Sequence, residues 1–356
     1  MKKVVVGMSG GVDSSVCALL LKEQGYEVIG ATMQIWQPEE CSIEREGSCC
    51  GASAVEDARA VAECLGIPYY VMNFREEFEK EVIDRFTGEY LKGRTPNPCI
   101  YCNQLIKWGA FLERCKKLGA DYIATGHYAG VIQLPSGRYT ISKSATPEKD
   151  QTYVLYNLTQ DQLAHTLMPV GAYQKPQIRE IAKKAGLPVA GKRDSQDICF
   201  IPDGDYASFV LKERGTLGTQ GNFVDMNGNL MGPHKGTANY TIGQRKGLGI
   251  AAGKRVYVCD IDLKTGDVTL GTDDDLYKDR LTFDTICYMG EEVFSEEESY
   301  LAKVRYSQSS VPCKVKYIDK DNVEVIFDKP VRAATPGQAV VLYKDGWIAG
   351  GGTIRK

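Results

Sequence analysis

Strand and helix patterns alternate through the first 130 residues, and this alternation constrains the fold more than any other feature of the chain. Residues 3–8 form an apolar strand pattern, 14–24 have a helical period, and 27–33 read as a second strand. The pattern continues with a helix at 52–65, a strand at 69–73, helices at 74–92 and 105–118, and a strand at 122–125. Such alternation predicts a parallel sheet covered by helices on both faces. Ligands of such sheets bind beyond the carboxyl ends of the strands.

The second half of the chain has a different character. Helical signals continue over 160–185, but beyond about residue 204 hairpin signals take over, such as Asn227-Gly228 and the turn at 264–266. After about residue 275 almost every pattern is strand-like, which is typical of a small antiparallel barrel. We therefore predict an α/β parallel-sheet nucleotide-binding domain over 1–204, a small mixed central domain over 205–274, and a C-terminal antiparallel β-barrel over 275–356.

Composition limits the class of protein. The chain has 356 residues and a net charge of −3, so it is not coated in positive charge, although a local basic face for RNA is compatible with that total. No apolar stretch approaches the length needed to span a bilayer, and we expect a cytoplasmic protein without a membrane partner. In a reducing compartment the 12 cysteines are expected to be buried, metal-bound or catalytic. We expect Cys17, Cys64 and Cys115 to be small core residues.

The most informative segment follows the first strand. Two glycines, Gly10 and Gly11, let the backbone turn tightly and present N–H groups, and the next helix adds the positive end of its dipole. Ser9 and Ser14 add hydroxyl donors. Asp13 would repel a bare phosphate, so a magnesium ion bridging phosphate oxygens is its expected partner. The alternative is a plain strand-to-helix turn capped by Asp13 or Ser14, and the segment has neither a Walker-type ending nor a dinucleotide Gly-x-Gly-x-x-Gly pattern.

Two further segments carry cysteines that could transfer sulfur. The first, 93–103, contains Pro96 and Pro98, which should hold an extended, rigid loop that ends in Cys102. The second, 193–200, is a polar run that reaches Cys199. A thiolate is a strong nucleophile and can carry a sulfane sulfur as a persulfide. Two such cysteines would suit sulfur transfer if the fold brings them together, whereas the alternative for each is a buried, inert thiol.

The phosphate loop resembles that of the PP-loop ATP pyrophosphatase superfamily, and the whole pattern closely resembles the tRNA-specific 2-thiouridylase family. The resemblance is carried by segments spread over nearly the full length: 9–14, 95–103, 125–128, 149–151, 194–200, 240–245 and 335–338. It implies an enzyme that uses ATP and Mg²⁺ to replace an oxygen of the wobble uridine of tRNA with sulfur. It also implies tRNAs for Lys, Glu and Gln as acceptors, with a sulfur-relay protein or cysteine desulfurase as donor.

The same resemblance implies roles for individual residues. Cys102 would be the nucleophile and Cys199 the persulfide carrier, the two would join in a disulfide, and Asp13 would be a third catalytic residue. The implied ATP-binding residues are Gly7, Met8, Ser9, Gly10, Gly11, Val12, Asp13, Ser14, Met33 and Gly126. The implied contacts with tRNA or the target base are Asn97, Pro98, Cys99, His127, Lys149, Asp150, Gln151, Arg305, Tyr306 and Gln338. The base would have to be flipped out of its stack.

Cys99 departs from the family pattern, because many relatives have Asp at this position. Cys99 and Cys102 have metal-ligand spacing, and with Cys199 they could ligate an iron–sulfur cluster through three cysteines. A thiol-only site without metal is the default interpretation. Cys41 and the Cys49-Cys50 pair lie in a loop rich in Gly and Ser, where we favour no metal site.

Basic residues gather over 175–193 and at 245–246 and 254–255, interleaved with Tyr173, Tyr240 and Tyr257. They predict either an RNA face, with tyrosines stacked on unpaired bases, or a solvated surface. His127 lies at a strand's carboxyl end, where it either contacts a base or packs within the protein. His234 lies in a Gly-Pro loop, where a solvated position is compatible with the sequence.

Two other functions compete with thiolation. Amide-forming synthetases share the phosphate loop and consume ammonia, but they have no need of Cys102 and Cys199. A non-enzymatic RNA-binding protein could use the loop only to hold a nucleotide as a switch.

Overall fold

The computed structural model describes residues 1–35, 52–192 and 198–356. The chain divides into two compact units. The first unit comprises 1–82, 99–204 and 346–348, and the second comprises 83–98, 205–345 and 349–356. Cys41, Cys49, Cys50 and the polar run 193–197 lie outside the described residues. Among the helices that the structure describes, none is both long and apolar enough to cross a membrane.

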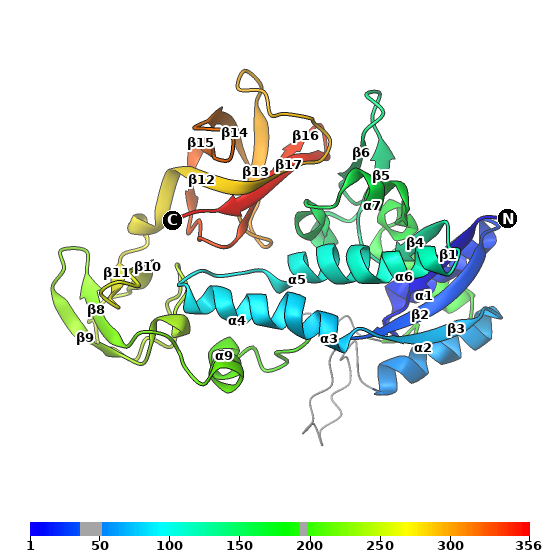
Figure 1. Ribbon diagram of the computed structural model, residues 1–356, viewed down its shortest axis with the longest axis horizontal. Helices are drawn as coiled ribbons and strands as arrows, with labels where there is room; N and C mark the ends of the chain where they lie inside the picture. The colour runs from blue at the N-terminus through cyan, green and yellow to red at the C-terminus, as the bar shows by residue number, and fades with distance from the viewer. Residues whose placement is uncertain (36–51, 193–197) are drawn as a thin grey trace. The chain divides into compact units, whose positions relative to one another are not determined.

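A five-stranded parallel sheet forms the centre of the first unit, in the order β3-β2-β1-β4-β7. Its strands are β1 (Lys3–Gly7), β2 (Glu27–Gln34), β3 (Tyr69–Asn73), β4 (Tyr122–Thr125) and β7 (Thr166–Leu167). Val4 and Val6 of β1 pack in one core with α1 (Val12–Glu23), α2 (Ala52–Leu65) and α8 (Lys175–Lys184). Figure 1 shows α2 running along β3. Val5 points to the other face and is also buried, so the predicted sheet with two covered faces is confirmed.

The first unit also contains short helical segments and a hairpin outside the parallel sheet. Helical segments are α3 (Arg75–Phe78), η1 (Glu79–Ile83, whose last residue belongs to the second unit), α5 (Pro98–Tyr101, whose first residue belongs to the second unit), η2 (Cys102–Phe111), α6 (Leu112–Lys117), η3 (Pro147–Lys149), η4 (Thr152–Leu155), α7 (Gln160–Ala164) and η5 (Pro169–Ala172). The strands β5 (Gly130–Gln133) and β6 (Tyr139–Ser142) form an antiparallel hairpin.

The predicted loop at 93–103 is partly wrong, because a helix starts at Pro98 and continues through α5, η2 and α6. Proline is well tolerated in the first turn of a helix, where its missing N–H would have had no partner. Cys99 and Cys102 are therefore helical residues. The segment η2 is a π-helix, a form often found at functional sites.

Cys17 and Cys115 are buried as predicted, whereas the prediction for Cys64 is wrong because its side chain is exposed. The buried stripe of α2 passes through Ala58, Val61 and Leu65. Cys64 lies off that stripe, since residues on one helical face recur every three or four positions.

The second unit contains a small four-stranded sheet and a barrel. The sheet has the order β10-β11-β8-β9, with β8 (Gly221–Asp225), β9 (Leu230–His234), β10 (Tyr257–Ile261) and β11 (Val268–Gly271). The strand β11 pairs with β8 in parallel, and the other two pairs are antiparallel. The predicted hairpin turn at Asn227-Gly228 joins β8 and β9. Helical segments of this unit are α4 (Asp84–Leu91), α9 (Tyr206–Arg214), η6 (Thr237–Asn239) and η7 (Asp274–Leu276).

Six antiparallel strands close the predicted C-terminal barrel. Their order is β12-β15-β14-β13-β16-β17, and β12 pairs with β17 to complete the ring. Their bounds are β12 (Tyr277–Tyr288), β13 (Tyr300–Lys303), β14 (Val311–Tyr317), β15 (Val323–Arg332), β16 (Ala339–Lys344) and β17 (Trp347–Ile354). Closure leaves no exposed strand edge in the ring.

Candidate active site

The phosphate loop joins the carboxyl end of β1 to the first turn of α1. Ser14 Oγ accepts from Ser9 N at 3.2 Å and donates to Gly11 O at 3.2 Å, which ties the loop to the helix. Gly11 is the N-cap residue and supplies no side-chain cap. The N–H groups of a helix's first turn have no intrahelical partner, and together with the dipole they form an anion site.

Gly10 is required by both conformation and space. Its φ is +68°, and a Cβ there would lie 2.4 Å from the carbonyl oxygen of Ala54 in α2. Only glycine accepts that combination without a shift of backbone.

Two of the predicted ATP residues, Gly126 and Met33, come from other segments and meet this loop. A Cβ on Gly126 would lie 2.6 Å from Ser14 N, so the end of β4 touches the N-terminus of α1. The Cε of Met33 lies 3.4 Å from the position of a Cβ on Gly7. Met8 and Val12 are buried, and a ligand would meet their backbone. Predicted ATP-binding residues from the ends of three strands therefore meet at the N-terminus of α1.

Asp13 has partners that sequence reasoning missed. Its Oδ1 and Oδ2 accept from Lys175 Nζ at 2.7 and 2.9 Å, and Oδ1 accepts from Tyr128 Oη at 2.8 Å. Lys175 belongs to the basic run 175–193 that was assigned to RNA or to a solvated face. Lys192, from the same run, donates to Gly10 O at 3.2 Å and pairs with Asp57 at 2.5 Å. Both lysines lie at the phosphate loop, and the available signal was their place near the start and the end of the basic run 175–193.

Replacing Lys175 with methionine is expected to lower the free energy of unfolding by about 1–3 kcal/mol, because the half-buried Asp13 loses its charged partner. The matched control is Lys184→Met in the same helix. Lys184 pairs with Glu180 on the surface, where such a pair contributes about 0.3–0.5 kcal/mol. Urea unfolding of both variants measures the difference. Equal losses in the two variants would mean that the Asp13–Lys175 pair is no stronger than a surface pair.

The part of the chain that the structure describes gives no support for an iron–sulfur cluster. Among its residues no group of three or more His, Cys, Asp or Glu side chains is arranged to hold a metal ion. Cys99 is exposed, while Cys102 and Cys199 are half-buried. Mg²⁺ needs only one or two carboxylates because substrate phosphates supply its other ligands, so it would enter with the nucleotide as part of the substrate.

The two candidate sulfur-transfer cysteines lie in the first unit. Cys102 is the first residue of η2, and the next residue, Asn103, is buried and donates to Val154 O at 2.9 Å. Cys199 precedes Phe200, whose ring packs edge-on against Phe78 at 5.7 Å between centroids. These contacts anchor the backbone next to each cysteine. The pairing of the two sulfur atoms stays a prediction.

His127 is buried and engaged within the protein. Its Nδ1 lies 2.6 Å from Thr125 Oγ1 and its Nε2 lies 3.5 Å from Lys107 Nζ. Burial, and secondarily the charge of Lys107, lower the pKa of His127 well below its ordinary value. The imidazole is therefore neutral, and its predicted contact with tRNA stays a prediction.

The segment 149–151 is held by its own hydrogen bonds. Asp150 accepts from Ser144 N at 3.1 Å and from Thr152 N at 3.2 Å, and Gln151 accepts from Tyr128 N at 2.8 Å. Gln151 is thus bonded to the backbone of Tyr128, whereas Asp150 is bonded to the backbone of Ser144 and Thr152, and Lys149 in η3 precedes both.

Several predicted RNA-contacting residues of the second unit lie in or beside segments that are hydrogen-bonded to one another. Gln338 Nε2 donates to Thr95 O at 2.8 Å, and Thr95 N donates to Pro336 O at 2.8 Å. Asn97 and Pro98 follow Thr95. Arg305 donates to Ala333 O at 3.0 Å and to Ile242 O at 2.8 Å. Tyr306 is exposed.

Two interpretations of the central segment are wrong. His234 is buried, with Nε2 donating to Gly266 O at 2.7 Å and Nδ1 accepting from Gly236 N at 3.1 Å, so it is not solvated. Tyr240 is buried against Phe223, so its ring cannot stack on a base.

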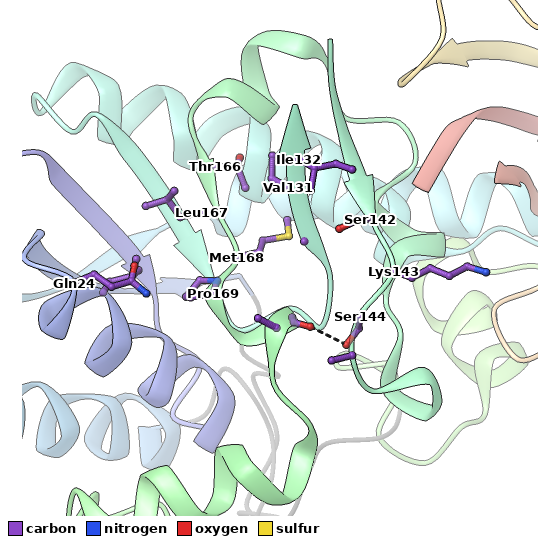
Figure 2. Close-up of a pocket in the computed structure, with 15 residues that line it drawn as sticks. Gln24, Val131, Ile132, Ser142, Lys143, Ser144, Thr166, Leu167, Met168 and Pro169 are labelled. Carbon is purple, nitrogen blue, oxygen red and sulfur yellow. Dashed lines mark hydrogen bonds between the residues drawn. The ribbon is translucent and has the colours of Figure 1, made fainter. Parts of the chain in front are cut away.

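A pocket of about 620 Å³ lies at the far end of α1 from the phosphate loop, where Leu21 and Gln24 contribute to its wall. A 12-residue helix is about 18 Å long. Figure 2 shows Val131 and Met168 among its apolar lining, with the ammonium of Lys143 directed away. Its lining does not suit a triphosphate.

Comparisons with known proteins agree with this architecture. The family model described as tRNA methyl transferase HUP domain matches residues 2–203. The tRNA methyl transferase PRC-barrel domain matches 208–272, and the aminomethyltransferase beta-barrel domain matches 278–354. The fold and the phosphate loop define a HUP-domain protein built to hold a nucleotide.

Curated relatives narrow the class. A tRNA-specific 2-thiouridylase MnmA of Lachnoclostridium phytofermentans is 55% identical over 357 residues, covering 100% of both chains. That of Clostridioides difficile is 51% identical over 356 residues, covering 100% of this chain and 98% of the relative. A solved 4-thiouridine synthetase–RNA complex with bound ATP is 20% identical, covers 57% of this chain and 46% of its own, and has a TM-score of 0.38. The chain belongs to the tRNA-specific 2-thiouridylase family.

Proposed function

We propose that this protein is a tRNA-uridine 2-sulfurtransferase that thiolates the wobble uridine, position 34, of tRNA at the expense of ATP. The observation that carries the proposal is the uncapped N-terminus of α1 with Gly10, Gly11 and Gly126 packed around it. It is an anion site at the carboxyl edge of a parallel sheet, where such folds bind nucleotides. Family membership supplies the uridine as the second substrate.

In the first step, the loop residues 7–14, with Met33 and Gly126, hold ATP and its bound Mg²⁺. The 2-carbonyl oxygen of a flipped-out uracil attacks the α-phosphorus. The bond to the bridging oxygen of the β-phosphate breaks, and pyrophosphate leaves. The carbonyl oxygen has then become part of a good leaving group, AMP.

In the second step, the terminal sulfur of a Cys199 persulfide attacks C2 of the base and AMP leaves. The Cys102 thiolate then attacks Cys199 Sγ, which releases the sulfur on the base and forms a Cys102–Cys199 disulfide. Two equivalents of an external thiol reduce that disulfide, become a disulfide themselves and restore both cysteine thiolates. The persulfide sulfur comes from a cysteine desulfurase or a sulfur-relay protein, in the cytoplasm.

The division of labour follows the three predicted domains. Residues 1–204 catalyse, and 205–274 and 275–356 contact tRNA, with tRNAs for Lys, Glu and Gln as acceptors. In this proposal, four residues lie against the target base: Asn97, Pro98, Cys99 and His127. Six others contact the rest of the tRNA: Lys149, Asp150, Gln151, Arg305, Tyr306 and Gln338.

Mass spectrometry of digested tRNA tests the proposal. Unmodified tRNA for Lys, Glu or Gln is incubated with the protein, ATP, Mg²⁺, a cysteine desulfurase with cysteine, and a thiol reductant. We expect 2-thiouridine at position 34, with AMP and pyrophosphate released in equal amounts, and none of these products without ATP. An ammonia-dependent amide product would favour an amide-forming synthetase instead, and nucleotide binding without any turnover would favour a switch.

A further inference from the structure

Lys107 has an uncommon environment for a lysine. It lies half-buried in η2, between Ile106 and Trp108, which are both fully buried. Its Nζ lies 3.5 Å from Nε2 of His127. Within residues 1–35, 52–192 and 198–356, no carboxylate lies within ion-pair distance of it. Keeping a charge half-buried without an opposite charge beside it costs free energy, and such a cost is typical of a residue whose charge has a function.

The hydrogen bond to His127 leaves most of the ammonium unused. Lysine has three donors and no acceptor, so Nε2 of the neutral imidazole must accept and Nδ1–H must donate to Thr125 Oγ1 at 2.6 Å. His127 therefore orients Lys107 without neutralising it. Two of the three N–H groups remain for a ligand.

The other two lysines of the site behave differently. Lys175 is paired with Asp13 and Lys192 with Asp57. Each of those positive charges is already balanced by a carboxylate. Lys107 alone among these three offers net positive charge to an anion.

Lys107 is connected both to the phosphate loop, where ATP would be cleaved, and to the helix of Cys102, where sulfur would be transferred. His127 directly follows Gly126, which touches Ser14 N at the start of α1. Lys107 also lies one π-turn after Cys102 in η2, and helical side chains lean toward the N-terminus of their helix. Lys107 thus contacts the residue that follows Gly126 at the phosphate loop, and it belongs to the same helical segment as Cys102. The α-phosphate takes part in both steps of the proposed reaction, and the proposed ATP position brings it close to Lys107.

We propose that Lys107 is a further catalytic residue, whose ammonium binds a non-bridging oxygen of the α-phosphate in ATP and then in the adenylated base. This inference rests on the proposed function. In the first step the contact offsets charge as the bond to the β-phosphate breaks. In the second it stabilises AMP as the leaving group. The competing explanation is that Lys107 only holds the ring of His127.

ATP with sulfur in place of one non-bridging α-oxygen distinguishes these explanations. The two diastereomers place sulfur on either side of the phosphorus, and an ammonium binds oxygen better than sulfur. The measurement is pyrophosphate release from each diastereomer, and from ATP, with Mg²⁺, unmodified tRNA and a cysteine desulfurase with cysteine, and 2-thiouridine is measured in the same samples. The variants are Lys107→Met, which keeps the apolar stem, and Lys107→Arg, which keeps the charge. The control is Lys117→Met, an exposed lysine at the end of the same helical run.

For wild type and Lys117→Met we expect a strong preference for one diastereomer. In Lys107→Met the rate with ATP should fall roughly 10²-fold, and the preference should fall at least tenfold, while Lys107→Arg should retain much of both. An equal loss with both diastereomers, or a wild type without preference, would overturn the assignment even if 2-thiouridine is still formed. If wild type forms 2-thiouridine without releasing pyrophosphate, the proposed activation step fails as well.

Discussion

Cys102→Ser is expected to reduce 2-thiouridine formation by roughly 10³-fold or more, because a serine hydroxyl cannot replace the thiolate as nucleophile at neutral pH. Cys199→Ser should have a loss of similar size for a different reason, since it removes the atom that carries the persulfide. Neither cysteine belongs to the phosphate loop, so both variants should bind ATP as wild type does. The loss should therefore be confined to the sulfur step.

The two variants should differ in what they retain. After incubation with a cysteine desulfurase and labelled cysteine, Cys102→Ser should keep labelled sulfur on Cys199, whereas Cys199→Ser should keep none there. Peptide mass spectrometry without reductant locates that sulfur. Cys64→Ser is the matched control, because Cys64 is an exposed thiol on α2. Full activity in either Cys102→Ser or Cys199→Ser would exclude the proposed relay.

The parallel sheet and the phosphate loop could be predicted because their causes are local in sequence. Alternating apolar periods indicate strands and helices, and Gly10 and Gly11 follow a buried strand directly. The barrel could be predicted for the same reason, since each of its strands has turn residues beside it. Local patterns also explain the error at residues 93–103, because Pro98 is compatible both with an extended loop and with the first turn of a helix.

The charge pairs of the site could not be predicted, because they depend on residues that meet only in the folded chain. Asp13 and Lys175 are 162 positions apart, and nothing near either residue indicates the other. The basic run 175–193 was therefore assigned to RNA or solvent, although two of its lysines reach the phosphate loop. His234 shows the same limit, since its burial depends on the carbonyl of Gly266, 32 residues away.

Gly10→Ala tests the phosphate loop against a matched glycine. Gly10 and Gly25 both have positive φ, at +68° and +85°, so alanine at either position should cost about 1–2 kcal/mol in backbone strain. At Gly25, in the turn after α1, no atom lies within 4 Å of the new Cβ. At Gly10 the Cβ would lie 2.4 Å from Ala54 O and 2.9 Å from Ala54 Cα, so the loop or α2 must move.

A loop displaced by about 1 Å would misplace the N–H groups that receive the phosphates, and such a shift can cost roughly 10²-fold in rate. We expect Gly10→Ala to lose ATP-dependent pyrophosphate release by about that factor, while Gly25→Ala loses stability alone. Thermal unfolding measures the strain that the two variants share, and nucleotide titration measures what only Gly10→Ala loses. Comparable pyrophosphate release by the two variants would show that the anion site does not depend on the conformation at Gly10. The departing pyrophosphate would then have to be held by another part of the carboxyl edge of the sheet.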